Sequence, residues 1–224
     1  MATAERTREA SQLLEPGRGV YDTHRAAALS GVPTSTLHYW ARTRLYSPSV
    51  SPAPRTRLWS WADLLALRAI DWFRKGDEGR AKASVLDIRR ALKELESVGY
   101  TRDALTHILA ISGGDGKLYL QLPGKIVRAY SGGQLAIADT LNLVAPYRNG
   151  PDLLRPRPLL RIIPGKLHGE PHIINTRIPS LTIAALDSAG YTVAQIHSMY
   201  PDATIDALHV AIDFERSLAT TIAA

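Results

Sequence analysis

The chain has 224 residues, of which 45% are hydrophobic and 21% are charged, a balance typical of a folded protein with one or two domains. It contains no cysteine, which excludes disulfides and thiolate metal sites and fits a reducing compartment. Residues 1–19 lack the apolar core of a signal peptide. No stretch approaches the ~20 apolar residues that cross a bilayer. We therefore expect a cytoplasmic protein with no membrane partner.

Charge is spread unevenly along the chain. Residues 18–75 hold nine Lys or Arg and three Asp, a net charge of +6, whereas residues 178–224 hold one Arg and five acids, a net charge of −4. The first segment therefore suits a polyanionic partner and the last does not.

The chain is predicted to begin with a flexible leader over residues 1–16. The alanine-rich stretch THRAAALS then predicts a helix with Asp22 or Thr23 as its N-cap, and Gly31 breaks it. A second helix, capped by Thr34 or Ser35, is expected to follow.

Residues 46–59 contain three prolines and end in a strand-like run, which predicts a hairpin or wing. The next stretch has apolar residues at helical spacing and predicts a strong helix with Ser60 as its cap. Another amphipathic helix is expected over about residues 82–98. Together these elements predict a winged helix-turn-helix domain over residues 17–99.

The pattern changes after Tyr100. Apolar and polar residues alternate here, and Gly-Asp-Gly, Pro-Gly and Gly-Gly interrupt them. This pattern predicts two or three short antiparallel strands within residues 100–150. Residues 151–160 are predicted to be a linker and residues 161–224 a helical domain, with helices near 179–189, 192–199 and 204–218. The predicted fold class is mainly α with small β elements.

The first two helices have the features of a DNA-reading unit. Close crossing of two such helices needs a small residue followed by a left-handed turn, and Ala27 and Gly31 supply this pair. Small polar residues lead the second helix, whose N-terminal part approaches base edges in such proteins. Four arginines and no acid lie between residues 40 and 60, which favours phosphate contacts. The predicted DNA-contacting residues are Thr34, Ser35, Thr36, His38, Tyr39, Arg42, Arg44, Arg55 and Arg57.

At these residues the sequence resembles the MerR family of regulators. AALSGVPTSTLHYW, RLYSP and RTRLWSWADLLALRAI are similar to that family's two-helix head, wing and third helix. The resemblance covers roughly residues 20–98. It implies that the 34–43 helix lies in a major groove with the 46–59 wing beside it. His38 stands where the family often has an arginine, and the family's long dimerising helix is not visible after residue 98.

Residues 161–218 resemble a small domain of undetermined function found in proteins classed as VapB-type antitoxins. The resemblance rests on RIIPGKLHGEPHIINTRIPS and AGYTVAQIHSMYPDATIDALHVAI, and above all on the run Gly-x-Pro-x-Ile-x-x-Thr-Arg-Ile-Pro. It implies a compact helical domain and a toxin partner, a PIN-domain ribonuclease of the VapC type. The last helices also have a helix-turn-helix rhythm, but their negative charge repels phosphate and argues against a second DNA head. Arg177 is expected to tie loop carbonyls together rather than to bind a ligand.

Catalytic and metal sites are not indicated by the motifs. His168, Glu170 and His172 suggest a metal site, but Gly169 and Pro171 exclude the helix that would align two histidines. No nucleophile elbow, P-loop or dinucleotide fingerprint is present. We expect no catalytic residue, no metal and no cofactor.

The leading hypothesis is an antitoxin that represses its own operon as a homodimer on double-stranded operator DNA and neutralises a PIN-domain toxin. The first alternative is a MerR-like regulator that responds to a small molecule held by residues 100–150 and has no toxin partner. The second alternative is an enzyme or RNA-processing factor in which His168, Glu170 and His172 converge in a cleft.

Overall fold

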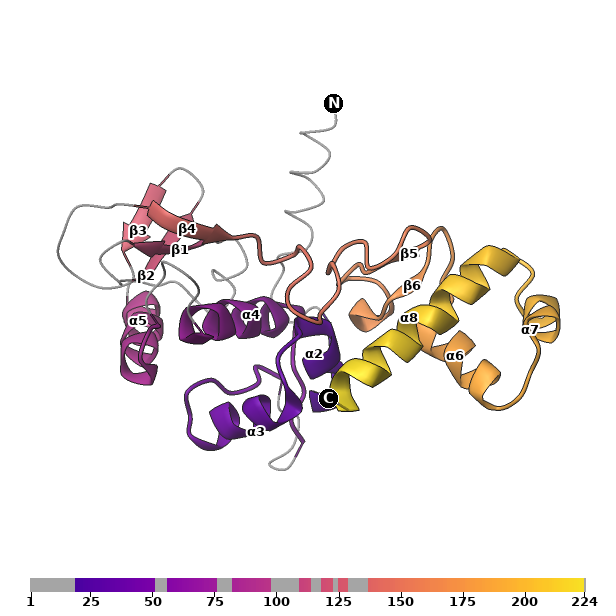
Figure 1. Cartoon of the computed structure of the whole chain (residues 1–224), viewed down its shortest axis with the longest axis horizontal. Coiled ribbons are helices and arrows are strands. Elements are labelled where there is room, and N and C mark those ends of the chain that lie inside the picture. Colours follow the sequence, from indigo (N-terminus) through magenta and orange to yellow (C-terminus); the bar gives the residue numbers. More distant parts are fainter. Residues whose placement is uncertain are drawn as a thin grey trace.

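The computed structural model describes residues 19–50, 56–75, 82–97, 109–113, 118–122, 125–128 and 137–223. It confirms the predicted fold class, mainly α with small β elements (Figure 1). The predicted leader, residues 1–16, and the wing residue Arg55 lie outside the described residues.

Among the described residues, four helices precede the strands of the middle segment. They are α2 (Thr23–Ser30), α3 (Thr34–Arg42), α4 (Trp61–Lys75) and α5 (Val85–Ser97). The predicted cap of α2 is confirmed, since the Arg25 amide donates to Asp22 Oδ1 over 2.7 Å. The predicted cap of α4 is confirmed as well, because the Asp63 amide donates to Ser60 Oγ over 3.2 Å.

The start of α3 differs from the sequence prediction. Pro33 occupies the N-cap position and no side chain caps the helix, although Thr34 or Ser35 was expected to do so. Proline has a fixed φ that is compatible with a helix start and needs no donor there, so the helix begins one residue earlier than a hydroxyl cap would allow.

The crossing of α2 and α3 follows the predicted pattern. Gly31 adopts a left-handed φ of +74° and its amide donates to the Ala27 carbonyl. Apolar side chains of the two helices and of the turn between them are buried: Ala26, Val32, Leu37 and Trp40. A Cβ on Gly31 would lie 2.4 Å from the carbonyl oxygen of Tyr147, so a turn far along the chain also requires glycine here.

Helix α4 is buried along nearly its whole length, from Trp61 to Phe73. Its buried polar side chains therefore need partners. Asp63 accepts four hydrogen bonds from the base of the wing and Asp71 accepts from Tyr147 and Arg148.

Arg68, in the middle of α4, donates all five of its guanidinium hydrogens to backbone carbonyls. The acceptors, at 2.6–3.1 Å, are the carbonyls of Leu29, Ser30, Leu143, Ala145 and Pro151. Burial lowers the pKa of Arg68 to about 9, so the side chain is still charged at neutral pH. The cation faces the carbonyl end of α2, where the helix dipole is negative. It thereby fixes the segment that leads toward the last domain.

The described residues in the middle of the chain form four antiparallel strands, whereas two or three were expected. They are β1 (Leu109–Gly113), β2 (Leu118–Leu122), β3 (Lys125–Arg128) and β4 (Ile137–Leu141), in the order β3-β2-β1-β4. β4 pairs with β1 across an irregularity at Ser112 and Gly113. β1 and β4 are neighbours in the sheet although two other strands separate them in the sequence.

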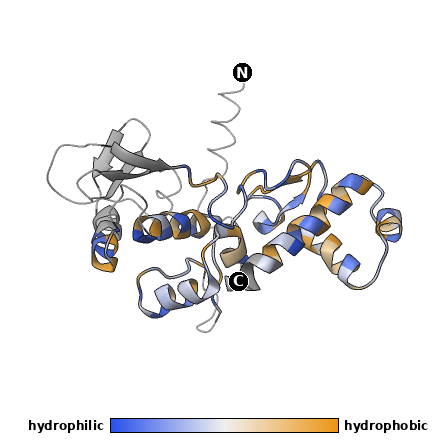
Figure 2. Cartoon of the chain, in the orientation of Figure 1, coloured by the Kyte–Doolittle hydropathy of each residue, from blue (hydrophilic) through white to orange (hydrophobic). Residues whose placement is uncertain are grey.

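The last part of the chain combines a two-stranded antiparallel sheet, β5 (Leu160–Arg161) and β6 (His172–Ile173), with three helices. These are α6 (Ser180–Ser188), α7 (Val193–Met199) and α8 (Ile205–Ala223), which confirms the three predicted helices. Hydrophobic and hydrophilic residues alternate along α8, as in a helix with one buried side (Figure 2). That side packs on α6 and α2. Residues 151–160, predicted to be a linker, bury Leu153 and Leu160.

Among the described residues, no helix has the length and apolar character needed to cross a membrane.

Candidate nucleic-acid interface and its anchor

The outer side of α3 is polar and exposed. Ser35, His38, Tyr39 and Arg42 are exposed along it, whereas Leu37 and Trp40 face the core. This arrangement follows from helical spacing, because residues three and four apart share a side. The guanidinium of Arg42 lies 6.0 Å from the centre of the Tyr39 ring, which is 44% exposed. We call these four exposed side chains the α3 face.

Two of the predicted contact residues do not belong to this face. Thr34 is half-buried, and its hydroxyl oxygen is buried without a hydrogen-bond partner. Thr36 is also half-buried. Of the three hydroxyl residues that lead the helix, Ser35 alone is fully exposed.

The wing supplies a cation to the α3 face. Arg57 Nη1 lies 3.2 Å from His38 Nδ1. A guanidinium has no acceptor, so Arg57 donates and His38 Nδ1 must carry a lone pair. The positive charge that the helix lacks at position 38 is therefore provided by Arg57 from a different element.

Backbone pairing and hydrogen bonds to α4 fix the position of the wing. Val50 and Leu58 pair in an antiparallel bridge, and Trp59 pairs with Tyr21, which precedes α2. The carboxylate of Asp63 accepts hydrogen bonds from Tyr46 Oη and from the amide and hydroxyl of Ser49, at 2.7–2.9 Å. These contacts hold Arg57 in place beside α3.

Two further cations border the α3 face. Arg44, a predicted contact residue, is exposed just after α3 and has a left-handed φ of +54°. Arg89 on α5 was not predicted to contribute, yet its guanidinium donates to the carbonyl of Thr43 at the end of α3. The Arg-Arg pair in the α5 sequence was the available signal, but nothing local placed it next to α3.

Some of the cations in residues 18–75 contact carbonyls or carboxylates within the protein. Arg68 is buried among carbonyls, and Lys75 pairs with Asp71 over 3.5 Å. Arg25, on the inner side of α2, pairs with two carboxylates of the last domain. The overall charge of +6 for residues 18–75 therefore overstates what faces a partner.

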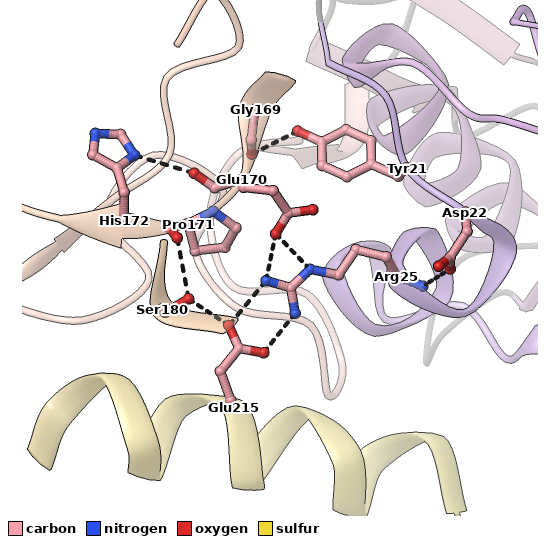
Figure 3. A network of polar contacts seen from close by, with 9 residues as sticks. All are labelled: Tyr21, Asp22, Arg25, Gly169, Glu170, Pro171, His172, Ser180 and Glu215. Atoms are coloured by element: carbon pink, nitrogen blue, oxygen red, sulfur yellow. Dashed lines mark hydrogen bonds and ion pairs between the residues drawn. The ribbon is translucent and has the colours of Figure 1, made fainter. Parts of the chain in front are cut away.

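The Arg25 network joins the helix-turn-helix to the last domain (Figure 3). Its Nε and Nη2 donate to Glu170 Oε2 over 3.0 and 2.8 Å, and its Nη1 donates to Glu215 Oε2 over 2.6 Å. Ser180 at the start of α6 also donates to Glu215. Tyr21 donates to the carbonyl of Gly169 over 2.9 Å. One guanidinium thus holds α2, the β5–β6 connection and α8 together.

Two carboxylates share a single cation in this network. Burial raises the pKa of Glu170 above its ordinary value, and the nearby charge of Arg25 opposes that shift. Burial alone lowers the pKa of Arg25, but hydrogen bonds and charges of Glu215 and Glu170 outweigh it and leave it above the ordinary value. The network therefore depends on Arg25 remaining in place.

The three residues of the enzyme alternative do not converge. The carboxylate of Glu170 is engaged by Arg25, and His172 is buried with its Nδ1 3.1 Å from the carbonyl of Glu170. His168 is exposed. In the part of the chain that the structure describes, no group of three His, Cys, Asp or Glu side chains is arranged to hold a metal ion.

Comparisons with known proteins bear on the last domain. Residues 161–214 match the family described as "Protein of unknown function (DUF433)". The crystal structure of Rv2018 from Mycobacterium tuberculosis is similar over 86% of this chain and 96% of that chain, with 15% identity and a TM-score of 0.43. That likeness is too weak to carry an argument about function. No curated protein matches the chain.

The structure shows a mainly α protein with small β elements, and residues 161–214 match the family described as "Protein of unknown function (DUF433)". The domain match agrees with the resemblance of residues 161–218 to a domain of undetermined function. The resemblance of residues 20–98 to MerR-type heads stays a prediction.

Proposed function

We propose that the protein is an antitoxin-like transcriptional regulator, which binds operator DNA through a MerR-like head and neutralises a PIN-domain ribonuclease through its last domain. The observation that carries the DNA part is the contact between His38 and Arg57. It gives the exposed side of the second helix a cation from the wing, at the position where the helix itself has none.

The proposed binding mode follows from the order of exposed residues. The N-terminal part of α3 would enter a major groove, where the Ser35 hydroxyl can donate to or accept from a base edge. Arg42, Arg44 and Arg57 would contact phosphates and make the affinity strongly salt-dependent. A homodimer would place two copies of α3 on the half-sites of a pseudo-palindromic operator.

Selection from a pool of random duplexes tests this part directly. The full chain should enrich a pseudo-palindromic sequence, and Arg55→Ala/Arg57→Ala should weaken its binding severalfold. Arg216→Ala is the matched control, because Arg216 is exposed on α8 and already pairs with Asp187. Failure of the wild-type chain to enrich any duplex would refute the DNA part.

The toxin part is supported by exposed apolar side chains on the last domain. Tyr191 and Met199, before and at the end of α7, are 45% and 46% exposed, and Ile205, the first residue of α8, is 49% exposed. Asp202 and Asp206 are exposed between and beside them. Such a surface fits a partner protein with apolar and basic groups.

Co-purification tests the toxin part. The full chain should form a stable complex with the product of the adjacent reading frame, and Met199→Glu should weaken that complex. Leu86→Glu serves as the control, because Leu86 is 54% exposed but lies on α5. Absence of a complex between the wild-type chain and that product would count against a toxin partner and leave the DNA part standing.

A further inference from the structure

The last domain carries a cluster of cations that the proposed function does not use. Five Lys or Arg residues lie between positions 153 and 186, together with a single acid, Glu170. We propose that Arg157, Arg161, Lys166 and Arg177, which lie on segments that hydrogen bonds join near the turn at Asn175, form a second nucleic-acid contact surface, separate from the α3 face. We call these four residues the Asn175 patch. The proposal does not depend on DNA binding by α3.

Backbone pairing brings together the segments that carry the four cations. The Ile174 amide donates to the Leu159 carbonyl over 2.9 Å, which places the segment before β5 beside the segment after β6. Lys166 Nζ reaches the Thr176 carbonyl over 2.7 Å from the connection between the strands. Arg161 is paired with His172 across the sheet. Three neighbouring segments thus carry the four cations, and the Arg157 side chain extends to α8, where its Nη2 donates to Ser217 Oγ over 3.4 Å.

The partners that the structure shows for the patch cations are carbonyls, a hydroxyl and an aromatic ring rather than acids. Arg157 and Arg161 donate to the carbonyls of Pro156 and Leu160, and Arg157 also lies 5.7 Å from the Phe214 ring centre. Within the described residues none of the four patch cations forms an ion pair. Glu170 is the one acid of the segment, and its carboxylate forms an ion pair with Arg25 of α2 (Figure 3).

The positive charges of the patch also affect His172. Burial lowers the pKa of His172, and the charges of Lys166 and Arg161 lower it further. Within the described residues, the one influence that opposes this shift in the pKa of His172 is its hydrogen bond with the Glu170 carbonyl. An anion near β6 would therefore be attracted by several cations at once.

Arg177 does not have the structural role expected of it. The sequence predicted that it would tie loop carbonyls together, but Lys166 makes that contact. Arg177 is exposed, and no hydrogen bond or ion pair joins it to the residues that the structure describes. A guanidinium left free in this way can bind a phosphate with two parallel hydrogen bonds.

A nucleic acid fits this surface better than an acidic protein does. Protein interfaces rely on buried apolar anchors, and Ile163 is the one large exposed hydrophobic side chain between residues 155 and 177. Spaced arginines without such anchors suit a repeating phosphate backbone. In Figure 1, α2 lies between β5–β6 and α3, so the two surfaces would hold different segments of nucleic acid.

The salt dependence of binding to a fluorescein-labelled random duplex of ~20 bp tests the proposal on the full chain. Arg177→Gln should weaken binding severalfold and reduce the magnitude of the slope of log K against log salt by about 0.9, the share of one phosphate contact. Arg177→Lys should keep the slope, since it keeps the charge. Arg216→Gln, which removes a charge already paired with Asp187, should bind as the wild type does.

The same titration in an Arg42→Gln/Arg57→Gln background separates the two surfaces. An effect of Arg177→Gln that persists there supports the Asn175 patch, whether or not the α3 variants weaken binding on their own. The proposal would be overturned if Arg177→Gln left the affinity and the salt slope unchanged both in the wild-type chain and in the Arg42→Gln/Arg57→Gln variant. Loss of poly-glutamate binding in Arg177→Gln, with duplex binding unchanged, would assign the patch to an acidic protein and overturn it as well.

Discussion

Arg25 on α2 donates to Glu215 on α8 over 2.6 Å, and this pair joins the two ends of the molecule. The same guanidinium also holds Glu170, and the three side chains are between 7% and 23% exposed. Removing it would leave two largely buried carboxylates without a cation. We therefore expect Arg25→Ala to lower the free energy of unfolding by about 3–5 kcal/mol, measured by urea denaturation.

A surface pair on α8 provides the comparison for Arg25. Arg216 is 65% exposed and pairs with Asp187 over 2.6 Å. Because solvent screens such a pair, Arg216→Ala should change stability by less than about 1 kcal/mol. Equal losses in the two variants would show that the Arg25 network does not anchor α2 to the last domain.

Arg68 should resist even its closest replacement. Lysine has three donors, so Arg68→Lys leaves at least two of five carbonyl acceptors without a partner. Each buried carbonyl left unpaired costs about 1–3 kcal/mol. Arg68→Met should cost more than Arg68→Lys, and half-exposed Arg74→Lys should be nearly neutral. Equal losses of stability for Arg68→Lys, Arg68→Met and Arg74→Lys on thermal unfolding would contradict the structural role of Arg68.

Two left-handed glycines should respond differently to a methyl group. At Gly31, with φ +74°, a Cβ would lie 2.4 Å from the Tyr147 carbonyl oxygen. At Gly190, with φ +91°, no atom lies within 4 Å. Gly190→Ala should cost about 1 kcal/mol for backbone strain alone, whereas Gly31→Ala should cost clearly more because two segments must also separate. Equal losses on chemical denaturation would contradict the close approach of these segments.

His172 should make the protein less stable in mild acid. Burial lowers the pKa of His172 in the folded chain below the ordinary value of 6.5 that it has when unfolded. As the pH falls below that value, the unfolded chain takes up the proton first, so stability decreases until the folded-state pKa is passed.

The variant His172→Asn removes the titration and keeps a donor for the Glu170 carbonyl. Its unfolding free energy should therefore vary less with pH below about 6.5 than that of the wild type. Parallel pH profiles for the two proteins would show that His172 is not the group responsible.

Local signals predicted the local structure well. The caps Asp22 and Ser60, the left-handed turn at Gly31 and the three last helices all depend on residues within a few positions of one another. A cap or a glycine turn is decided by backbone groups next to it, so a single sequence contains the information.

The contacts that organise the molecule were not predictable in the same way. Arg25 meets Glu170 and Glu215 across 145 and 190 positions, and Arg68 meets Pro151 across 83. Both arginines were counted in the net charge of residues 18–75 and so as part of a basic surface, because charge alone does not distinguish a buried cation from an exposed one. The contact between Arg57 and His38 is also long-range, and it decides which cation lies beside α3.

The salt dependence of operator binding by Arg57→Gln tests the central claim most directly, namely that the α3 face and Arg57 contact DNA. With a duplex enriched by the wild-type chain, the magnitude of the slope of log K against log salt should fall by about 0.9 for Arg57→Gln and stay unchanged for Arg216→Gln. Wild-type affinity and slope in Arg57→Gln would contradict the assignment of this surface to DNA.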